Sequence, residues 1–154
     1  LSGGVYLGGT GSANKLEDYE EGNFTPFLDN ATGGNTATYG NVYGNYVKVG
    51  DLIYCQFRIP ITAKGGGSGN IRIGGLPFAA TAPVDFMGGN SDLFYTNAAT
   101  NWVNLKAGVR SSNTQLYVFG QTSATNNVIR EGNFTSSNIN SNFELRGSVA
   151  YRVS

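Results

Sequence analysis

The chain has 154 residues, no histidine and a formal net charge of zero. This length suits one domain, which would bury roughly two thirds of the surface that its unfolded chain exposes. Because Lys and Arg form no cluster, neither nucleic-acid binding nor a polybasic membrane anchor is expected. Without histidine, Ser-His-Asp and Cys-His nucleophiles and the usual zinc sites are excluded, which leaves paired carboxylates as the familiar hydrolytic machinery.

The composition predicts an all-β protein. Glycine contributes 23 residues, and Tyr and Phe contribute nine each. Gly, Asn and Asp supply the positive φ angles that turns need, whereas Tyr, Phe, Val, Ile and Thr fit the pleated surface of a sheet. We therefore expect an antiparallel β-sandwich with a jelly-roll-like arrangement. No apolar run reaches the ~18 residues of a membrane span, so membrane insertion is not expected.

Residues 1–21 are expected to form a short linker that is extended or contains a helical turn. The segment begins with LSGGVYLGG, which lacks the charged and apolar regions of a signal peptide and suggests a cut inside a longer protein. The stretch ANKLEDYEE (13–21) is the one that favours a helix, and a helix so short is marginal in water. It also holds an acidic cluster, formed by Glu17, Asp18, Glu20 and Glu21.

The next clear signal is a β-hairpin over residues 46–62. Two apolar-rich runs flank Gly50 and Asp51, and glycine at the first central position favours a two-residue turn. Alternate residues of the second run are predicted to face the core, namely Ile53, Cys55, Phe57, Ile59 and Ile61. Pro60 predicts an edge or a bulge, because proline donates no hydrogen bond to a sheet. Cys55 is expected to be a buried thiol.

Further strands are predicted after residue 70. Ile71, Ile73 and Leu76 are expected to face inward in the first of them. The others are expected around residues 93–96, 102–109, 115–120, 128–130, 133–136 and 143–153. The last is a long, half-buried strand whose predicted inward residues are Phe143, Leu145, Gly147, Val149, Tyr151 and Val153.

Residues 88–104 contain the candidate ligand site, with Asp92, Tyr95, Asn101, Trp102 and Asn104 as its ligand-binding residues. Aromatic rings offer contact area, here for the apolar side of a sugar ring, while Asn and Asp provide adaptable hydrogen bonds. The alternative for Trp102 is a position in the core or between subunits. Tyr54 and Tyr117 are further exposed candidates, because they lie opposite in phase to core residues; the alternative for both is the interface between subunits. No catalytic residue, cofactor or metal site is expected, although scattered Asp and Asn residues could form a calcium site across chains.

The stretch LGGTGSANKLEDYEEGNFTPFL, followed by YGNVYGNYVKVGDLIYCQFRI and IGGLPF, resembles the C-terminal domains of tail fibres of tailed bacteriophages. In that family, a Gly-Gly-Thr-Gly segment with an acidic cluster links a fibrous shaft to a terminal β-structured knob. The matching positions are 8–11, 13–14, 16–22 and 24–26, then 46, 48 and 50, then 75–78. Residues after 80 match no motif of the family, so no binding residue is carried over.

The resemblance implies a homotrimer in the virion, at the distal end of a tail fibre and joined to an upstream fibre shaft. Residues 1–21 would link shaft and knob and help trimerisation, with residues 22–154 as the receptor-binding knob. The implied partner is a host envelope glycan, such as lipopolysaccharide or capsule, or an outer-membrane protein. The chain is then expected not to be an enzyme; the alternatives are a glycan depolymerase module of a tailspike and a purely structural trimer cap. The acidic cluster would pair with Lys15 and with an arginine of a neighbouring chain; the alternative is a solvated turn whose charges keep the linker soluble.

Overall fold

The computed structural model describes residues 5–6, 8–9, 15–16, 18–30, 36–81, 88–110, 112–122, 130–131 and 134–153. Its strands are β1 (Val5–Tyr6), β2 (Lys15–Leu16), β3 (Tyr19–Asn23), β4 (Phe27–Asn30), β5 (Thr38–Tyr39), β6 (Tyr43–Val49), β7 (Leu52–Ala63), β8 (Ile71–Gly74), β9 (Gly88–Ala98), β10 (Asn104–Val109), β11 (Leu116–Gln121), β12 (Arg130–Glu131) and β13 (Ile139–Arg152). All pairings between them are antiparallel. One 3₁₀ turn, η2 (Ser136–Asn138), is the helical element of the described residues. The predicted all-β, antiparallel fold is confirmed.

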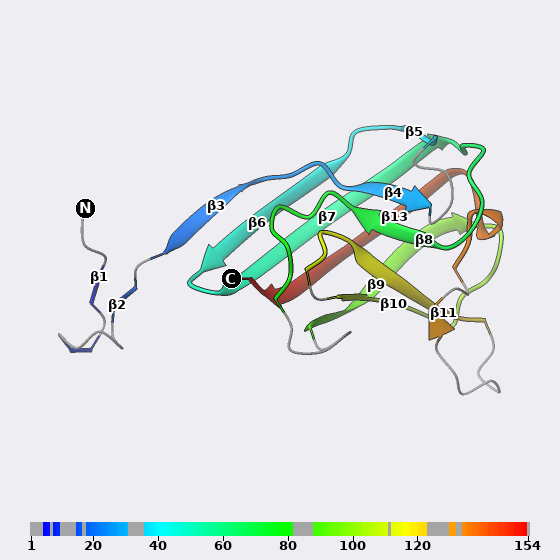
Figure 1. The fold of residues 1–154 in the computed structure, drawn as a ribbon. Coiled ribbons are helices and arrows are strands. Elements are labelled where there is room, and N and C mark those ends of the chain that lie inside the picture. Colours follow the sequence, from blue (N-terminus) through cyan, green and yellow to red (C-terminus); the bar gives the residue numbers. More distant parts are fainter. Residues whose placement is uncertain are drawn as a thin grey trace.

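The main strands form two sheets that share β9. Sheet I has the order β3-β6-β7-β13-β9, and sheet II has the order β9-β10-β11-β8-β4, while β5 pairs with β7 and β12 with β11. Residues 93–98 of β9 pair with β13, whereas residues 88–92 pair with β10, so one strand passes from one sheet to the other. β4 and β8 cross in front of β7 and β13 (Figure 1), and the buried side chains between them form one cluster. This arrangement is the expected β-sandwich.

The β6–β7 hairpin folds as its sequence predicts. Val49 pairs with Leu52, which leaves Gly50 and Asp51 as the two-residue turn. Gly50 has a φ of 56°, a left-handed value that glycine adopts without strain. All the β7 residues predicted to face the core are buried, at 3% exposure or less.

Pro60 lies within β7, just before an irregular pairing of that strand with β5. The pairing of β5 with β7 shifts register between Thr38 and Tyr39, which lie opposite Ala63 and Ile61. Gly40 donates its backbone N–H to the Pro60 carbonyl at 2.9 Å, so the oxygen of this peptide group is satisfied. The irregularity thus follows Pro60 along β7, while Pro60 itself lies opposite Glu144 in the ladder with β13.

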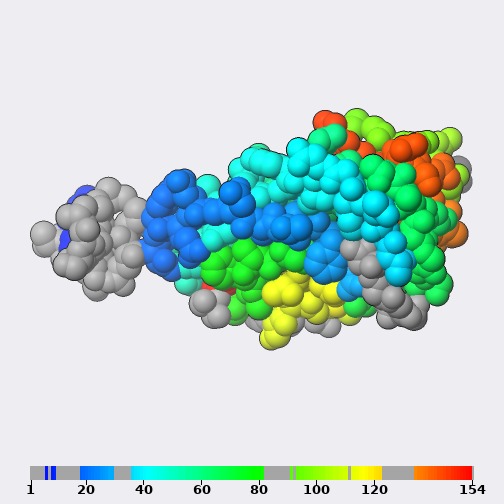
Figure 2. Space-filling view, turned by 90° about the horizontal axis from the view of Figure 1, so that it is seen from above, coloured from blue at the N-terminus to red at the C-terminus, as the bar shows by residue number. Residues whose placement is uncertain are grey.

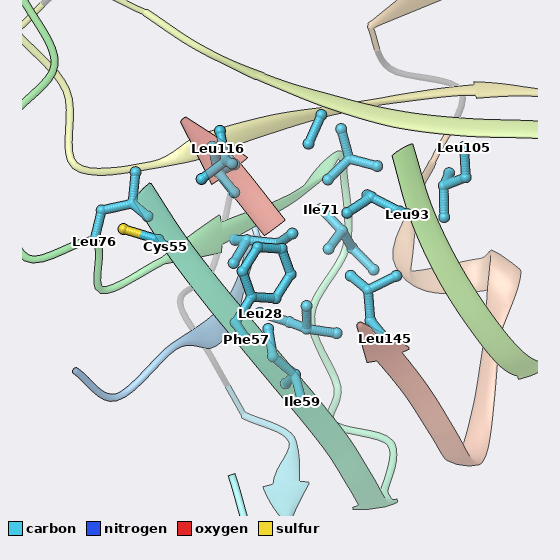
Figure 3. Close-up of a cluster of buried hydrophobic side chains, with 14 of the residues drawn as sticks. Leu28, Cys55, Phe57, Ile59, Ile71, Leu76, Leu93, Leu105, Leu116 and Leu145 are labelled. Carbon is cyan, nitrogen blue, oxygen red and sulfur yellow. The ribbon is translucent and has the colours of Figure 1, made fainter. Parts of the chain in front are cut away.

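The core lies between the two sheets. Figure 3 shows the Phe57 ring of β7 among aliphatic side chains from both sheets, including Leu28 of β4, Leu116 of β11 and Leu145 of β13. The residues predicted to face inward after position 70 are buried, with the exception of the half-buried Gly147: Ile71, Ile73, Leu76, Phe143, Leu145, Val149, Tyr151 and Val153. Alternation with a period of two therefore locates the core correctly in β7, β8 and β13.

The helical turn expected in residues 13–21 is wrong for the part of that stretch that the structure describes. Lys15–Leu16 form β2, and Tyr19–Asn23 form β3. Glu20 lies opposite Lys48 in the ladder between β3 and β6. This pairing to a strand distant in sequence outweighs the weak helix preference of a short stretch. Residues 13, 14 and 17 lie outside the described residues.

The strand expected at residues 133–136 is also wrong in its described part. Thr135 makes an isolated bridge to Asn70, after which η2 begins. The Asn138 side chain accepts the backbone N–H of Thr135 at 2.8 Å, a capping contact that competes with a strand ladder. Of the strand expected at 128–130, β12 (Arg130–Glu131) is described, and residues 128–129 lie outside the described part.

Candidate interaction face

Tyr95 and Trp102 of the predicted ligand site come together, and they meet inside the sandwich. The Tyr95 hydroxyl accepts the backbone N–H of Trp102 at 2.6 Å and donates to the Trp102 carbonyl at 3.0 Å. The Trp102 side chain is 8% exposed and packs edge-on against Phe134, with 5.6 Å between ring centroids. Its Nε1 is buried and has no hydrogen-bond partner among the described residues. This placement matches the core alternative for Trp102.

The remaining predicted ligand residues lie apart from that pair. Asn101 and Asn104 are exposed, and Nδ2 of Asn104 donates to Oε1 of Gln121 at 2.9 Å. Asp92 lies on β9 opposite Lys106, and its side chain is outside the described residues. Ligand binding by the five predicted residues stays a prediction.

Tyr54 and Tyr117, both expected on the surface from their phase, differ in the structure. Tyr54 is exposed on β7, as expected. Tyr117 is 4% exposed, because the guanidinium groups of Arg72 and Arg110 each lie 4.4 Å from its ring centroid and cover it. Tyr117 does lie on the side of β11 opposite to its core residues, as the alternation predicts. Long arginine side chains on that outward side nevertheless shield its ring from water.

The acidic cluster has partners in its own chain. Asp18 forms an ion pair with Lys48, a lysine of β6 that is 8% exposed. The hydroxyl groups of two tyrosines donate to two more acids of the cluster, Tyr46 to Glu20 and Tyr19 to Glu21. The contacts of Lys48 and Tyr46 connect β6 to the β3 segment, whereas the contact of Tyr19 lies within β3. Pairing with an arginine of a neighbouring chain stays a prediction. Glu17 and the Lys15 side chain lie outside the described residues.

Exposed apolar side chains gather on the outer face of sheet I. Among the described residues nine large apolar side chains are exposed, and seven of them belong to this face: Tyr19, Tyr43, Val47, Val49, Leu52, Tyr54 and Phe94. Because Ile53 and Cys55 face the core, Leu52 and Tyr54 face outward, and their partners on β6 share that side. Scattered exposed apolar residues are ordinary, whereas a group of them on one face marks an interaction surface.

Five of the seven residues form what we call the apolar end of this face. Tyr19, Val49 and Leu52 lie in register on three adjacent strands, and Val47 and Tyr54 form the next row. The apolar end lies where β3 joins the sandwich. In Figure 2 the blue β3 and the orange η2 occupy opposite ends of the sandwich.

Farther along the same face lies a hollow of about 350 Å³, which we call the aromatic hollow. It is lined by Tyr43 of β6, Gln56 and Phe57 of β7, Phe94 of β9, and Arg146, Gly147 and Ser148 of β13. Gly147 lets the buried Phe57 ring pack directly beneath the strand, since a Cβ atom there would lie 2.8 Å from Cζ of Phe57. The volume falls within the ~300–1,000 Å³ typical of small-molecule sites.

Glu144 holds two guanidinium groups at the edge of the hollow. Nη2 of Arg58 donates to Oε2 of Glu144 at 2.7 Å, and Nε of Arg146 donates to Oε1. The hydrogen bond from Arg58 is the main cause that holds the pKa of Glu144 below its usual range, and it also raises the pKa of Arg58. Glu144 is therefore ionised at neutral pH, and two positive charges face one negative charge.

Other reactive groups are sparse in the described part of the chain. Cys55 is fully buried, as expected, and this burial raises the pKa of its thiol to about 12. Within the same residues, no group of three or more His, Cys, Asp or Glu side chains could hold a metal ion. Nor do they include a helix of the length and apolarity needed to cross a membrane.

No protein-family model matches the sequence, and no curated protein matches it. Among solved structures, the chain is similar to the Dettilon tailspike protein (gp208), with a TM-score of 0.62 and 20% sequence identity. The similarity covers 85% of this chain and 23% of the tailspike chain, so this chain spans less than a quarter of that protein's length. At this level of identity the similarity shows a shared fold.

This neighbour overturns one expectation from the sequence, namely that the chain is not an enzyme. That expectation followed from the resemblance to tail fibres and from the absence of histidine, and a glycan depolymerase module of a tailspike was its alternative. The structural neighbour is a tailspike, and missing histidine does not exclude hydrolysis by paired carboxylates. Activity on glycans therefore has to be measured.

Proposed function

We propose that this chain is the host-binding module of a phage tail protein, and that it attaches the virion to a glycan of the bacterial envelope, such as lipopolysaccharide or capsule. The observation that carries the proposal is the exposed apolar face of sheet I, of which Tyr43 and Phe94, at the aromatic hollow, lie outside the apolar end. Apolar side chains that stabilise the fold are buried in the core, whereas a group of them on the surface is available to a partner. The fold shared with a tailspike and the fibre-like sequence of residues 8–26 support a tail protein. The alternative partner on the host surface is an outer-membrane protein.

The proposed assembly is a homotrimer whose chains meet at the apolar end. Tyr19, Val47, Val49, Leu52 and Tyr54 offer a contiguous surface with no net charge of their own, which suits contact between identical copies. In this proposal residues 1–21 link the knob to an upstream shaft at the distal end of a tail fibre or tailspike, and residues 22–154 form the knob. Three copies would multiply weak single-site contacts with the host.

Binding to host cells tests the proposal. The chain, labelled with a fluorophore, is incubated with cells that the phage infects and with a resistant strain that lacks the receptor, and bound protein is measured after sedimentation. We expect saturable binding to the sensitive cells and at least tenfold less binding to the resistant ones. Equal binding to both strains, or none to either, would contradict a host-binding role.

A second candidate is a module that cleaves the glycan it binds, because the structural neighbour is a tailspike protein. Hydrolysis of a glycosidic bond creates a reducing end, which is detected chemically. The chain is incubated with purified host polysaccharide, and reducing ends are counted over time. An increase that depends on chain concentration supports cleavage, and a constant value removes this candidate.

A further inference from the structure

The aromatic hollow has rings at both ends and charge between them. Tyr43, Arg58, Arg146 and Phe94 lie in one row across four adjacent strands, β6, β7, β13 and β9. Three strand spacings separate the two aromatic residues, about 14 Å. Tyr43 is 51% exposed and Phe94 62% exposed, so each ring offers a surface for a flat apolar group. This spacing suits a short oligosaccharide better than a single sugar.

The charges in the row favour an anionic ligand. Glu144 neutralises one of the two guanidinium groups that it contacts, which leaves one positive charge in excess. Arg146 uses Nε for Glu144, and its two Nη atoms donate to no described residue. Its side chain is 53% exposed, so this planar pair of donors can reach a ligand. Such a fork matches a carboxylate or a phosphate group, and Glu144 limits the rotamers that Arg146 adopts.

Polar groups between the two rings are fixed in place. The Tyr54 hydroxyl accepts a hydrogen bond from Nε2 of Gln56 at 3.1 Å. The Gln56 amide oxygen accepts no hydrogen bond from a described residue, so it is available for a sugar hydroxyl. Gln56 and Ser148 both line the hollow.

The hollow borders the apolar end, because Tyr54 of that end accepts a hydrogen bond from Gln56 of the hollow, while the row of Tyr19, Val49 and Leu52 lies farther from it. On β6, the residue of the apolar end that is nearest to Tyr43 is Val47, four residues away. This separation corresponds to about 13 Å along the strand. A trimer joined through Tyr19, Val49 and Leu52 would thus leave the hollow open to solvent.

We propose that the aromatic hollow binds an anionic saccharide of the host envelope, with a carboxylate or phosphate group on Arg146 and sugar rings on Tyr43 and Phe94. The proposal rests on the host-binding function proposed above and names the chemistry of its ligand. The anion is the shared feature of uronate-type capsular sugars and of phosphorylated lipopolysaccharide sugars.

The test uses oligosaccharides released from the host capsule and lipopolysaccharide, measured by calorimetry against the full chain. Each preparation is compared with its own carboxyl-reduced form and with its own dephosphorylated form. The treatment that weakens binding shows whether the bound anion is a carboxylate or a phosphate. We expect an intact preparation to bind at least tenfold more tightly than one of its neutralised forms. Equal binding of intact and neutralised forms, or no binding of any form, overturns the proposal.

Variants place the binding at this site. Arg146→Gln should weaken binding by about tenfold to a hundredfold, the value of a lost charge-assisted hydrogen bond. Arg152→Gln is the matched control, because Arg152 lies on the same face of β13, is exposed and pairs with Asp51 outside the hollow. Phe94→Ala should also weaken binding, and its exposed position spares the core. If Arg146→Gln and Phe94→Ala bind as the unmodified chain does, the site is wrong.

The same variants separate this proposal from the host-binding function. If the unmodified chain binds sensitive cells and Arg146→Gln binds them equally well, host binding stands and the anionic site fails. If the unmodified chain does not bind the cells, the host-binding function itself fails. Thermal melting of each variant confirms that the fold is intact.

Discussion

Replacing Gly120 by alanine should destabilise the sandwich through a collision with Trp102. A Cβ atom on Gly120 would lie 2.5 Å from Cε3 and 2.8 Å from Cη2 of the indole, closer than non-bonded carbon atoms approach. The indole cannot move aside easily, because it is buried against Phe134 and its backbone is held by Tyr95. Such overpacking costs about 1–3 kcal/mol. At roughly 2–4 °C per kcal/mol for a domain of this size, Tm should fall by about 2–12 °C.

Thermal unfolding followed by circular dichroism measures this effect, with Gly66→Ala as the matched control. Nothing lies within 4 Å of a Cβ atom at Gly66, so that substitution should change stability by less than about 0.5 kcal/mol. In a Trp102→Phe background the colliding indole atoms are gone, and Gly120→Ala should cost at least 1 kcal/mol less than in the unmodified chain. An equal cost in both backgrounds would refute the packing of Trp102 on Gly120.

Three further predictions concern the interaction face, the Cys55 thiol and the Glu144 carboxylate. Leu52→Asp should reduce the solution mass, measured by light scattering, from three chains toward one, whereas Val103→Asp, at an exposed apolar residue outside the apolar end, should not; a trimeric Leu52→Asp variant would contradict the proposed contact. The Cys55 thiol, whose pKa burial raises to about 12, should react with a thiol reagent at pH 8 in denaturant and not in the native state, and rapid native labelling would show that Cys55 is accessible. The pKa of Glu144 is lowered mainly by the hydrogen bond from Arg58, so its contribution to stability is present above the ordinary carboxyl pKa and is lost as pH falls through the lowered value. The difference in Tm between the unmodified chain and Glu144→Gln should therefore shrink below about pH 4, and a difference independent of pH would contradict this role.

The sequence predicted those parts of the fold that local patterns determine. Alternation in β7 and β13 identified the buried residues correctly, because a strand with one side on the core must repeat every two residues. Gly50 identified the hairpin turn, because a left-handed φ in a two-residue turn favours glycine. The buried thiol of Cys55 followed from its place in the same alternation.

Features that depend on pairing between distant strands could not be predicted from the sequence. Lys48 faces Asp18 only because β3 lies beside β6, and neither residue signals the other. The aromatic hollow likewise needs four strands in one register, which brings Tyr43 within three strand spacings of Phe94. Phase alone could not tell that Trp102 packs inward, because it precedes β10 on a loop where the alternation does not apply.

Competition with virion adsorption tests the host-binding claim most directly. Sensitive cells are incubated with increasing amounts of the chain, virions are then added, and the unadsorbed virions are counted after a fixed time. The account predicts that the unadsorbed fraction rises with chain concentration and reaches a plateau, while heat-unfolded chain has no effect. Unchanged adsorption at concentrations that saturate the cells with bound chain would contradict it.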